Sequence, residues 1–218
     1  MSKYTFEQYR QIFDGVIRKY EGQDFFVKLI ETLGKPAFPS APRDVAAIGI
    51  RREGKEKEFR ENTADDTISL VRIDSDGLQQ VYEYAGTTES GLFKEVINPE
   101  GDFKMSPGFY FFKHGIHHGK NPCLVQAGAV LGERAKKGKA YDETDSKTWQ
   151  ITDGSLHIHA GIMNKENVGN WSAGCQVIAG GFSGKEWTEF YKNCQMATNL
   201  PIPYLLVNET DIPELLGV

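Results

Sequence analysis

The chain has 218 residues, a formal net charge of −5, and ordinary shares of hydrophobic (39%) and charged (25%) residues, which is the composition of a folded, water-soluble protein. The acidic balance, without a basic stripe, argues against a nucleic-acid partner. No apolar run approaches the roughly 18 residues that would span a bilayer, so no membrane span is predicted. The length suits one large domain, or one domain with a small helical appendage.

Residues 5–33 carry apolar side chains at helical spacing, and Thr5 with Gln8 forms a predicted capping box. Asp24 is the expected N-cap of a second helix, and three prolines after that helix make a stiff linker. We therefore predict that residues 1–40 form an N-terminal helical hairpin and linker.

From residue 41 onward the periodicity becomes that of strands, and two apolar runs flank an Asp-Gly pair typical of a hairpin. The charged segment 51–61 is expected to be exposed, and the polar segment 131–154 to be a lid or surface excursion. Ser183 and Glu186 are predicted to cap a helix. Predicted strands cover 45–50, 67–73, 78–84, 109–113, 122–130 and 203–207. The predicted fold is α+β, a β-rich domain over 41–218 with the helical hairpin packed on it.

The three cysteines have irregular spacing and form no disulfide framework. Cys194 belongs to a helical stripe with Trp187 and Phe190, and Cys123 lies in a strand-like run, so both are expected in the core. Only Cys175 has the small and polar neighbours of a reactive thiol.

The segment 155–181 contains the residues that carry chemistry. Alternating polarity in its first part predicts a strand with His157 and His159 on one face. Cys175 follows sixteen residues after His159. A thiol needs to become a thiolate to attack, and a neighbouring imidazole is its usual activator. We predict Cys175 as nucleophile and His159 as its base, with His157 one pleat further from the cysteine.

The residues just before the thiol complete the predicted site. Ser172 is expected to orient it by hydrogen bonding, and Gly174 to let backbone N–H groups approach an oxyanion. Substrate contacts are assigned to nearby side chains, namely His117, His157, Trp171, Ala173 and Gln176.

Histidines gather in two places, 114–118 and 157–159, which raises the alternative of a three-histidine zinc site. The sequence has no carboxylate motif such as HExxH. Histidines that line a substrate groove are therefore favoured, and neither a metal nor another cofactor is predicted.

Three short motifs, His159-Ala160-Gly161, Val168-Gly169 and Ser172-Ala173-Gly174-Cys175, resemble in order and spacing the HG…G…SxGC signature of L,D-transpeptidase (YkuD-type) catalytic domains. The WSAGCQV version resembles a divergent branch found in phage and bacterial proteins. The resemblance implies a β-rich fold and a cysteine acyl-enzyme that acts on peptidoglycan stem peptides as an L,D-transpeptidase or L,D-carboxypeptidase. It also implies that a backbone carbonyl can orient the imidazole.

The chain departs from that pattern at three positions. Ala160 stands where the family usually has Gly, Ala173 where a second His is frequent, and Val177 where Arg or Asn is usual. Val177 supports an alternative, a cell-wall-binding or phage structural module without activity. Another Cys/His peptidoglycan amidase is disfavoured, because in the NlpC/P60-like class the cysteine precedes the histidine.

Peptidoglycan lies outside the cytoplasmic membrane, yet the first residues show no apolar segment or cleavage site of an export signal. This combination favours delivery to the periplasm or cell wall by a specialised secretion machine or a phage. The expected partners are then peptidoglycan stem peptides, together with a secretion-system component or an immunity protein.

Overall fold

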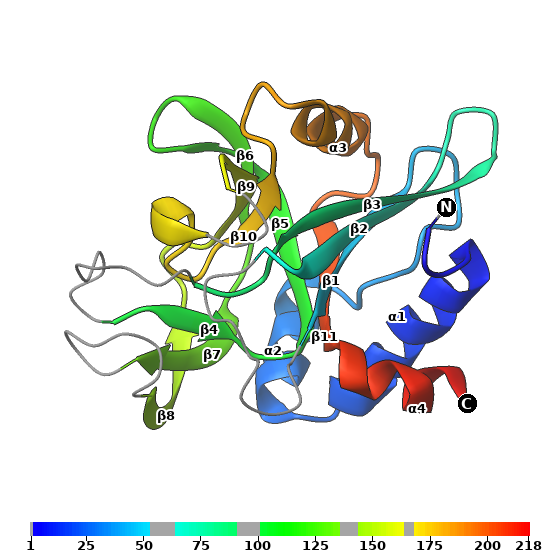
Figure 1. The fold of residues 1–218 in the computed structure, drawn as a ribbon. Helices are drawn as coiled ribbons and strands as arrows, with labels where there is room; N and C mark the ends of the chain where they lie inside the picture. Colours follow the sequence, from blue (N-terminus) through cyan, green and yellow to red (C-terminus); the bar gives the residue numbers. More distant parts are fainter. Residues whose placement is uncertain (1, 53–63, 91–100, 136–143, 164–167) are drawn as a thin grey trace.

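The computed structural model describes residues 2–52, 64–90, 101–135, 144–163 and 168–218 (Figure 1). Within these residues, eight strands close into a barrel in the spatial order β1-β11-β5-β6-β9-β10-β3-β2, and three more form a sheet in the order β4-β7-β8. The barrel strands are β1 (Val45–Arg51), β2 (Asp66–Ile73), β3 (Gln79–Thr87), β5 (Gly108–His117), β6 (Asn121–Gln126), β9 (His157–Gly161), β10 (Gln176–Ala179) and β11 (Ile202–Asn208). The smaller sheet consists of β4 (Phe103–Met105), β7 (Val130–Ala135) and β8 (Thr144–Ile151).

The helices flank the barrel on two sides. They are α1 (Phe6–Tyr20), α2 (Asp24–Leu33), α3 (Lys185–Gln195) and α4 (Ile212–Leu216), with short 3-10 turns at Gly169–Trp171 and Glu209–Asp211. Figure 1 shows α3 on one side of the barrel and α1, α2 and α4 on the other. None of the helices in the described residues is long and apolar enough to cross a membrane. The architecture is mixed α/β and rich in strands, as the sequence predicts.

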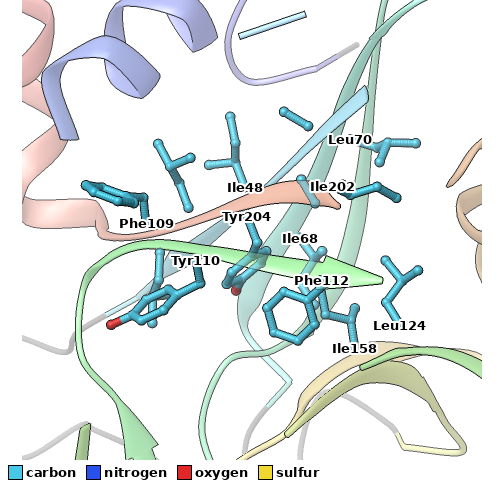
Figure 2. Close-up of a cluster of buried hydrophobic side chains, with 14 of the residues drawn as sticks. Ile48, Ile68, Leu70, Phe109, Tyr110, Phe112, Leu124, Ile158, Ile202 and Tyr204 are labelled. Atoms are coloured by element: carbon cyan, nitrogen blue, oxygen red, sulfur yellow. The ribbon is translucent and has the colours of Figure 1, made fainter. Parts of the chain in front are cut away.

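Apolar side chains from strands far apart in the sequence fill the barrel. Figure 2 shows Ile48, Ile68, Phe112, Leu124 and Ile158 gathered in this core, where all five are fully buried. Burying one such side chain contributes about 1.5–3 kcal/mol. The interior is therefore a packed core, and polar chemistry has to be built on the barrel wall or at its rim.

The first helix begins as its sequence predicts. The Thr5 hydroxyl accepts from the Gln8 N–H at 3.2 Å, and the Gln8 side-chain oxygen accepts from the Thr5 N–H at 2.9 Å, which completes the capping box. The second helix differs by one position, because Gln23 is its N-cap and Asp24 is its first helical residue. In that place the carboxylate still favours the helix, since it lies at the positive end of the helix dipole.

The N-terminal helices share one hydrophobic core with the barrel. Phe26 of α2 is fully buried, and its ring centroid lies 4.7 Å from that of Phe109 on β5. A Cβ placed on Gly108 would lie 2.3 Å from Cζ of Phe26, so the glycine gives the ring room to approach the strand. Residues 1–40 therefore pack directly on the barrel.

Two predicted surface segments have more structure than their polarity indicates. Within 131–154, β7 and β8 pair antiparallel with Leu131 opposite Gln150, while residues 136–143 lie outside the described part. In the predicted exposed segment 51–61, Arg51 belongs to β1 and is only 1% exposed, and residues 53–61 lie outside the described part. A polar segment can therefore form a strand when neighbouring groups provide hydrogen-bond partners for its polar side chains.

The predicted cap at Ser183 is wrong. The N-cap of α3 is Gly184, and no side chain bonds to the first turn. The predicted strand over 109–113 is too short, because β5 extends through His114 to His117 and pairs with β6 up to Asn121.

We predict that Phe26→Ala lowers the free energy of unfolding by about 3–5 kcal/mol, because it removes a buried ring and leaves a cavity. Val27→Ala, at the next position of α2 where the side chain is 37% exposed, is the matched control and should lose less than about 1 kcal/mol. Urea denaturation measures both. Equal losses would show that α2 does not pack on the barrel as described.

Candidate active site

The two halves of the predicted site lie on adjacent parallel strands. In the register of β9 and β10, Gln176 pairs with Ile158 and Val177 with His159. Cys175 precedes Gln176, so it lies level with His157, and His159 lies two residues further, roughly 7 Å along the strand. The prediction that His157 is further from the cysteine than His159 is therefore reversed along the backbone, because the two strands run in the same direction.

A tight turn presents the thiol. The Ser172 hydroxyl donates to the Cys175 carbonyl at 2.8 Å and accepts from the Gly174 N–H at 3.1 Å. Gly174 has φ +131°, and a Cβ there would lie 2.7 Å from the Phe103 carbonyl oxygen. The Phe103 N–H in turn donates to the Ala173 carbonyl at 3.1 Å. Ser172, Ala173 and Gly174 thus shape the turn and fix it against β4, and the Ala173 carbonyl is engaged by the protein itself.

The side chain of Gln176 points into the barrel and is completely buried. Its oxygen accepts from the Tyr204 hydroxyl at 2.6 Å, and its amide lies 3.5 Å from the Thr88 carbonyl. Sequence reasoning assigned Gln176 to substrate binding. In the structure it instead ties the residue after the thiol to β11, on the far side of the core.

A buried cation lies behind this contact, and sequence reasoning missed it. The Arg51 guanidinium donates to the carbonyls of Thr88 and Met105, each at 2.9 Å, and to the Thr88 hydroxyl at 3.1 Å. Thr88 also donates through both its N–H and its hydroxyl to one oxygen of Asp66, each at 2.7 Å. Burial raises the pKa of Asp66 to about 6, although these hydrogen bonds oppose the shift. The position of Arg51 at the end of an apolar strand was the only sequence signal for its burial.

Cys175 is partly buried. Burial raises the pKa of Cys175 to about 11, and a hydrogen bond from the backbone N–H of His157 partly offsets this. The sulfur lies 3.9 Å from the Ser155 carbonyl oxygen, which accepts weakly from the thiol. At neutral pH the group is therefore a thiol.

The imidazole of His159 is 1% exposed. Its Nδ1 lies 2.8 Å from the Ala160 carbonyl oxygen, which can only accept, so Nδ1 carries the hydrogen. Nε2 is then the bare nitrogen, and it is buried without a hydrogen-bond partner. Burial lowers the pKa of His159 to about 4, against the opposing effect of the Ala160 hydrogen bond. The ring is a neutral base in a fixed tautomer.

Other histidines surround that ring. His117 stacks on His159 with ring centroids 4.0 Å apart and an angle of 21° between the planes. Nδ1 of His117 lies 2.7 Å from Nδ1 of His157, and the His118 ring packs edge-on against His117. His114 lies elsewhere, with its ring against Tyr191. The structure thus brings His117, His157 and His159 together as predicted for a shared site.

Trp171 ends the 3-10 turn before the thiol and is partly buried. A Cβ on Gly161 would lie 3.0 Å from Cγ of Trp171, so the indole packs against the end of β9. Its predicted contact with substrate stays a prediction.

The zinc alternative finds no support in the described residues, where no group of three or more His, Cys, Asp or Glu side chains is arranged to hold a metal ion. In the histidine cluster, Nδ1 of His117 and Nδ1 of His157 face each other, and Nδ1 of His159 bonds to backbone. These ring nitrogens satisfy each other or the main chain.

Comparison with family models, curated proteins and solved structures gives no match. The functional argument therefore depends on the geometry of the site and on the sequence motif that contains Cys175.

Gly174→Ala should destabilise the protein more than Gly77→Ala. Both glycines have positive φ, +131° and +83°, but a Cβ at Gly77 meets nothing within 4 Å. Backbone strain alone is worth about 1–3 kcal/mol, and only at Gly174 does a backbone carbonyl also block the new carbon. Denaturant unfolding of the two variants provides the comparison, and a smaller loss for Gly174→Ala would contradict the described turn.

Proposed function

We propose that the chain is a cysteine-dependent acyl-transfer enzyme that acts on peptidoglycan stem peptides, in an L,D-transpeptidase-like fold. One observation carries the proposal. His159 holds a bare, buried Nε2 on the strand next to Cys175, with its tautomer fixed by the Ala160 carbonyl. Orientation of an imidazole by a third group is one part of the arrangement that activates a thiol. In the resting protein the Cys175 sulfur contacts the Ser155 carbonyl and not Nε2 of His159, so the proposed reaction requires the thiol to turn to Nε2 when substrate binds. The WSAGC turn supplies the link to peptidoglycan through its resemblance to the transpeptidase signature.

In the proposed reaction, the Cys175 sulfur bonds to the carbonyl carbon that precedes the terminal D-alanine of the stem. The thiol proton passes to Nε2 of His159 and then to the departing D-alanine amine as the C–N bond breaks. An amine or water then attacks the resulting thioester. Attack by an amine gives a cross-link or an exchanged residue. Attack by water hydrolyses the thioester, which is carboxypeptidase activity. The same histidine accepts the proton of the incoming group in that second step.

The oxyanion of each tetrahedral intermediate needs backbone donors. Sequence reasoning assigned this role to the N–H groups near Gly174 and Cys175, but Ser172 already accepts from the Gly174 N–H. We therefore assign the oxyanion to the N–H of Cys175. Ser172 then holds the Cys175 N–H in place, because its hydroxyl bonds to the Gly174 N–H before that group and to the Cys175 carbonyl after it.

The resting state of the pair is uncharged. The pKa of Cys175 is raised to about 11 and that of His159 is lowered to about 4, so a preformed thiolate–imidazolium pair is unfavourable at neutral pH. Proton transfer must then accompany attack on the carbonyl. His159 acts as a general base rather than as the counter-ion of a standing thiolate.

The raised pKa of Cys175 also favours a second candidate, a cell-wall-binding module of the same fold without turnover. The rate of thiol alkylation would not separate the two, because a protonated thiol reacts slowly in both cases. Formation of a covalent acyl-enzyme with a stem peptide does separate them, since a binding module forms a complex but no thioester.

Incubation with a tetrapeptide stem should release D-alanine, and mass spectrometry should detect an adduct on Cys175. Cys175→Ala should abolish both, and His159→Gln should reduce turnover by about 10²–10⁴-fold. Cys194→Ala, at a buried thiol remote from this chemistry, is the control and should turn over substrate. Stem-peptide binding without adduct or D-alanine release would favour the non-catalytic module.

The activity should persist to unusually low pH. Only neutral His159 accepts the thiol proton, and its pKa is about 4, so kcat/KM should rise as the pH increases through about 4 and be level at neutral pH. Because burial disfavours the charged ring, the folded state also loses stability as the pH falls from about 6.5 towards 4. Tryptophan fluorescence at each pH should therefore accompany the rates. A midpoint between 6 and 7 in folded protein would contradict a buried base.

A further inference from the structure

We propose that His117 is a positioning residue that acts through His159: its ring covers the ring of the base, and its hydrogen bond to His157 holds that cover in place as a neutral group. The inference rests on the proposed role of His159 as the base. It assigns His117 a role other than contact with substrate.

The covering contact follows from the ring geometry. His117 lies on His159 nearly parallel, with centroids 4.0 Å apart. Phe182 is the second ring that stacks with His159, with a centroid distance of 6.1 Å and an interplanar angle of 15°. His159 is left with 1% exposure. His117 itself is only partly buried, so it lies between the base and solvent.

A short chain of hydrogen bonds fixes the tautomers. Nε2 of His157 lies 3.1 Å from the Gly154 carbonyl oxygen, so that nitrogen donates. Nδ1 of a neutral His157 is then an acceptor, and the facing Nδ1 of His117, at 2.7 Å, is the donor. The bond exists only while one of the two rings is neutral, since two imidazolium rings would both present N–H groups.

The β5–β6 hairpin sets the place of His117. The Lys120 N–H donates to the His117 carbonyl at 3.1 Å, and the two residues between them, His118 and Gly119, have φ of +48° and +68°. This left-handed turn closes the hairpin with His117 at the end of β5, from which its ring reaches across β6 to the ring of His159 on β9. The cover is thus attached to the barrel wall.

Burial, reinforced by charge repulsion, keeps His117 neutral. Burial is the larger cause, and the charged forms of His159, His118 and His157 act in the same direction, so that the pKa of His117 is lowered to about 3. A protonated His117 would place a cation 4.0 Å from the ring centroid of the base and would lose its donor–acceptor fit with His157 if that ring were also charged. Neutral His117 therefore keeps the cover in place without adding a charge that would lower the pKa of His159 further.

The first test is histidine NMR of the whole protein at neutral pH, which needs no turnover. Nitrogen shifts should show neutral Nδ1–H tautomers for His159 and His117, and the neutral Nε2–H tautomer for His157. A protonated His117, or one with its hydrogen on Nε2, would overturn the proposal.

The second test compares His117→Ala with His117→Phe. Removal of the ring admits water to His159 and should raise its NMR-titrated pKa by on the order of one to two units, and the acid limb of kcat/KM should move with it. Phe retains a neutral covering ring but loses the hydrogen bond to His157, so it should shift both less than Ala does. His118→Asn, on the same turn with a residue that tolerates positive φ, is the control and should shift the titration less than His117→Ala.

The outcomes separate the two proposals. An unchanged His159 titration in His117→Ala, or an equal shift in His117→Phe, would refute the covering role even in an active enzyme. The expected titration shifts in a protein without turnover would uphold the cover and refute the acyl-transfer function.

Discussion

Strands β9 and β10 run parallel, so the chain must return along the barrel between them. As a result, β10 begins level with the start of β9. This register places Cys175 beside His157 and Val177 beside His159. Side chains alternate between the two faces of a strand, so a shift of one residue would turn the thiol to the opposite face from the imidazoles. The site depends on this single pairing more than on any contact between its side chains.

A buried polar network keeps the second strand in that register. Gln176 follows Cys175 and points inward, where Tyr204 donates to it. Thr88 links this position to the Arg51 guanidinium and to Asp66. Apolar packing tolerates small slips, whereas these hydrogen bonds have fixed directions, and breaking one leaves a buried polar group unsatisfied. Arg51 is compensated by Glu89, whose carboxylate lies 3.4 Å away, so the network does not leave a buried charge without a counter-charge.

The features that could be predicted from the sequence are those that local chemistry dictates. The capping box of Thr5, the hairpin around the Asp-Gly pair and the shared face of His157 and His159 need only neighbouring residues. The features that were missed depend on partners far away in the chain. Burial of Arg51 requires carbonyls from two other segments, and the inward position of Gln176 requires Tyr204 from β11. The parallel register could not be predicted, because alternation fixes a face but not a direction.

His159 is oriented by a carbonyl and not by a carboxylate. This difference decides whether the His159 imidazole and the Cys175 thiol can lie in a packed barrel wall. A carboxylate partner would fix the same tautomer and also raise the basicity of the ring, but it would add a second buried charge that needs its own compensation. The Ala160 carbonyl fixes the tautomer without adding charge, so burial still lowers the pKa of the base. With Cys175 also protonated, the resting pair then carries no net charge. A packed barrel wall can hold an uncharged pair with little disturbance of its apolar surroundings. In the proposed reaction, charge then separates only when substrate and backbone donors are present to stabilise it.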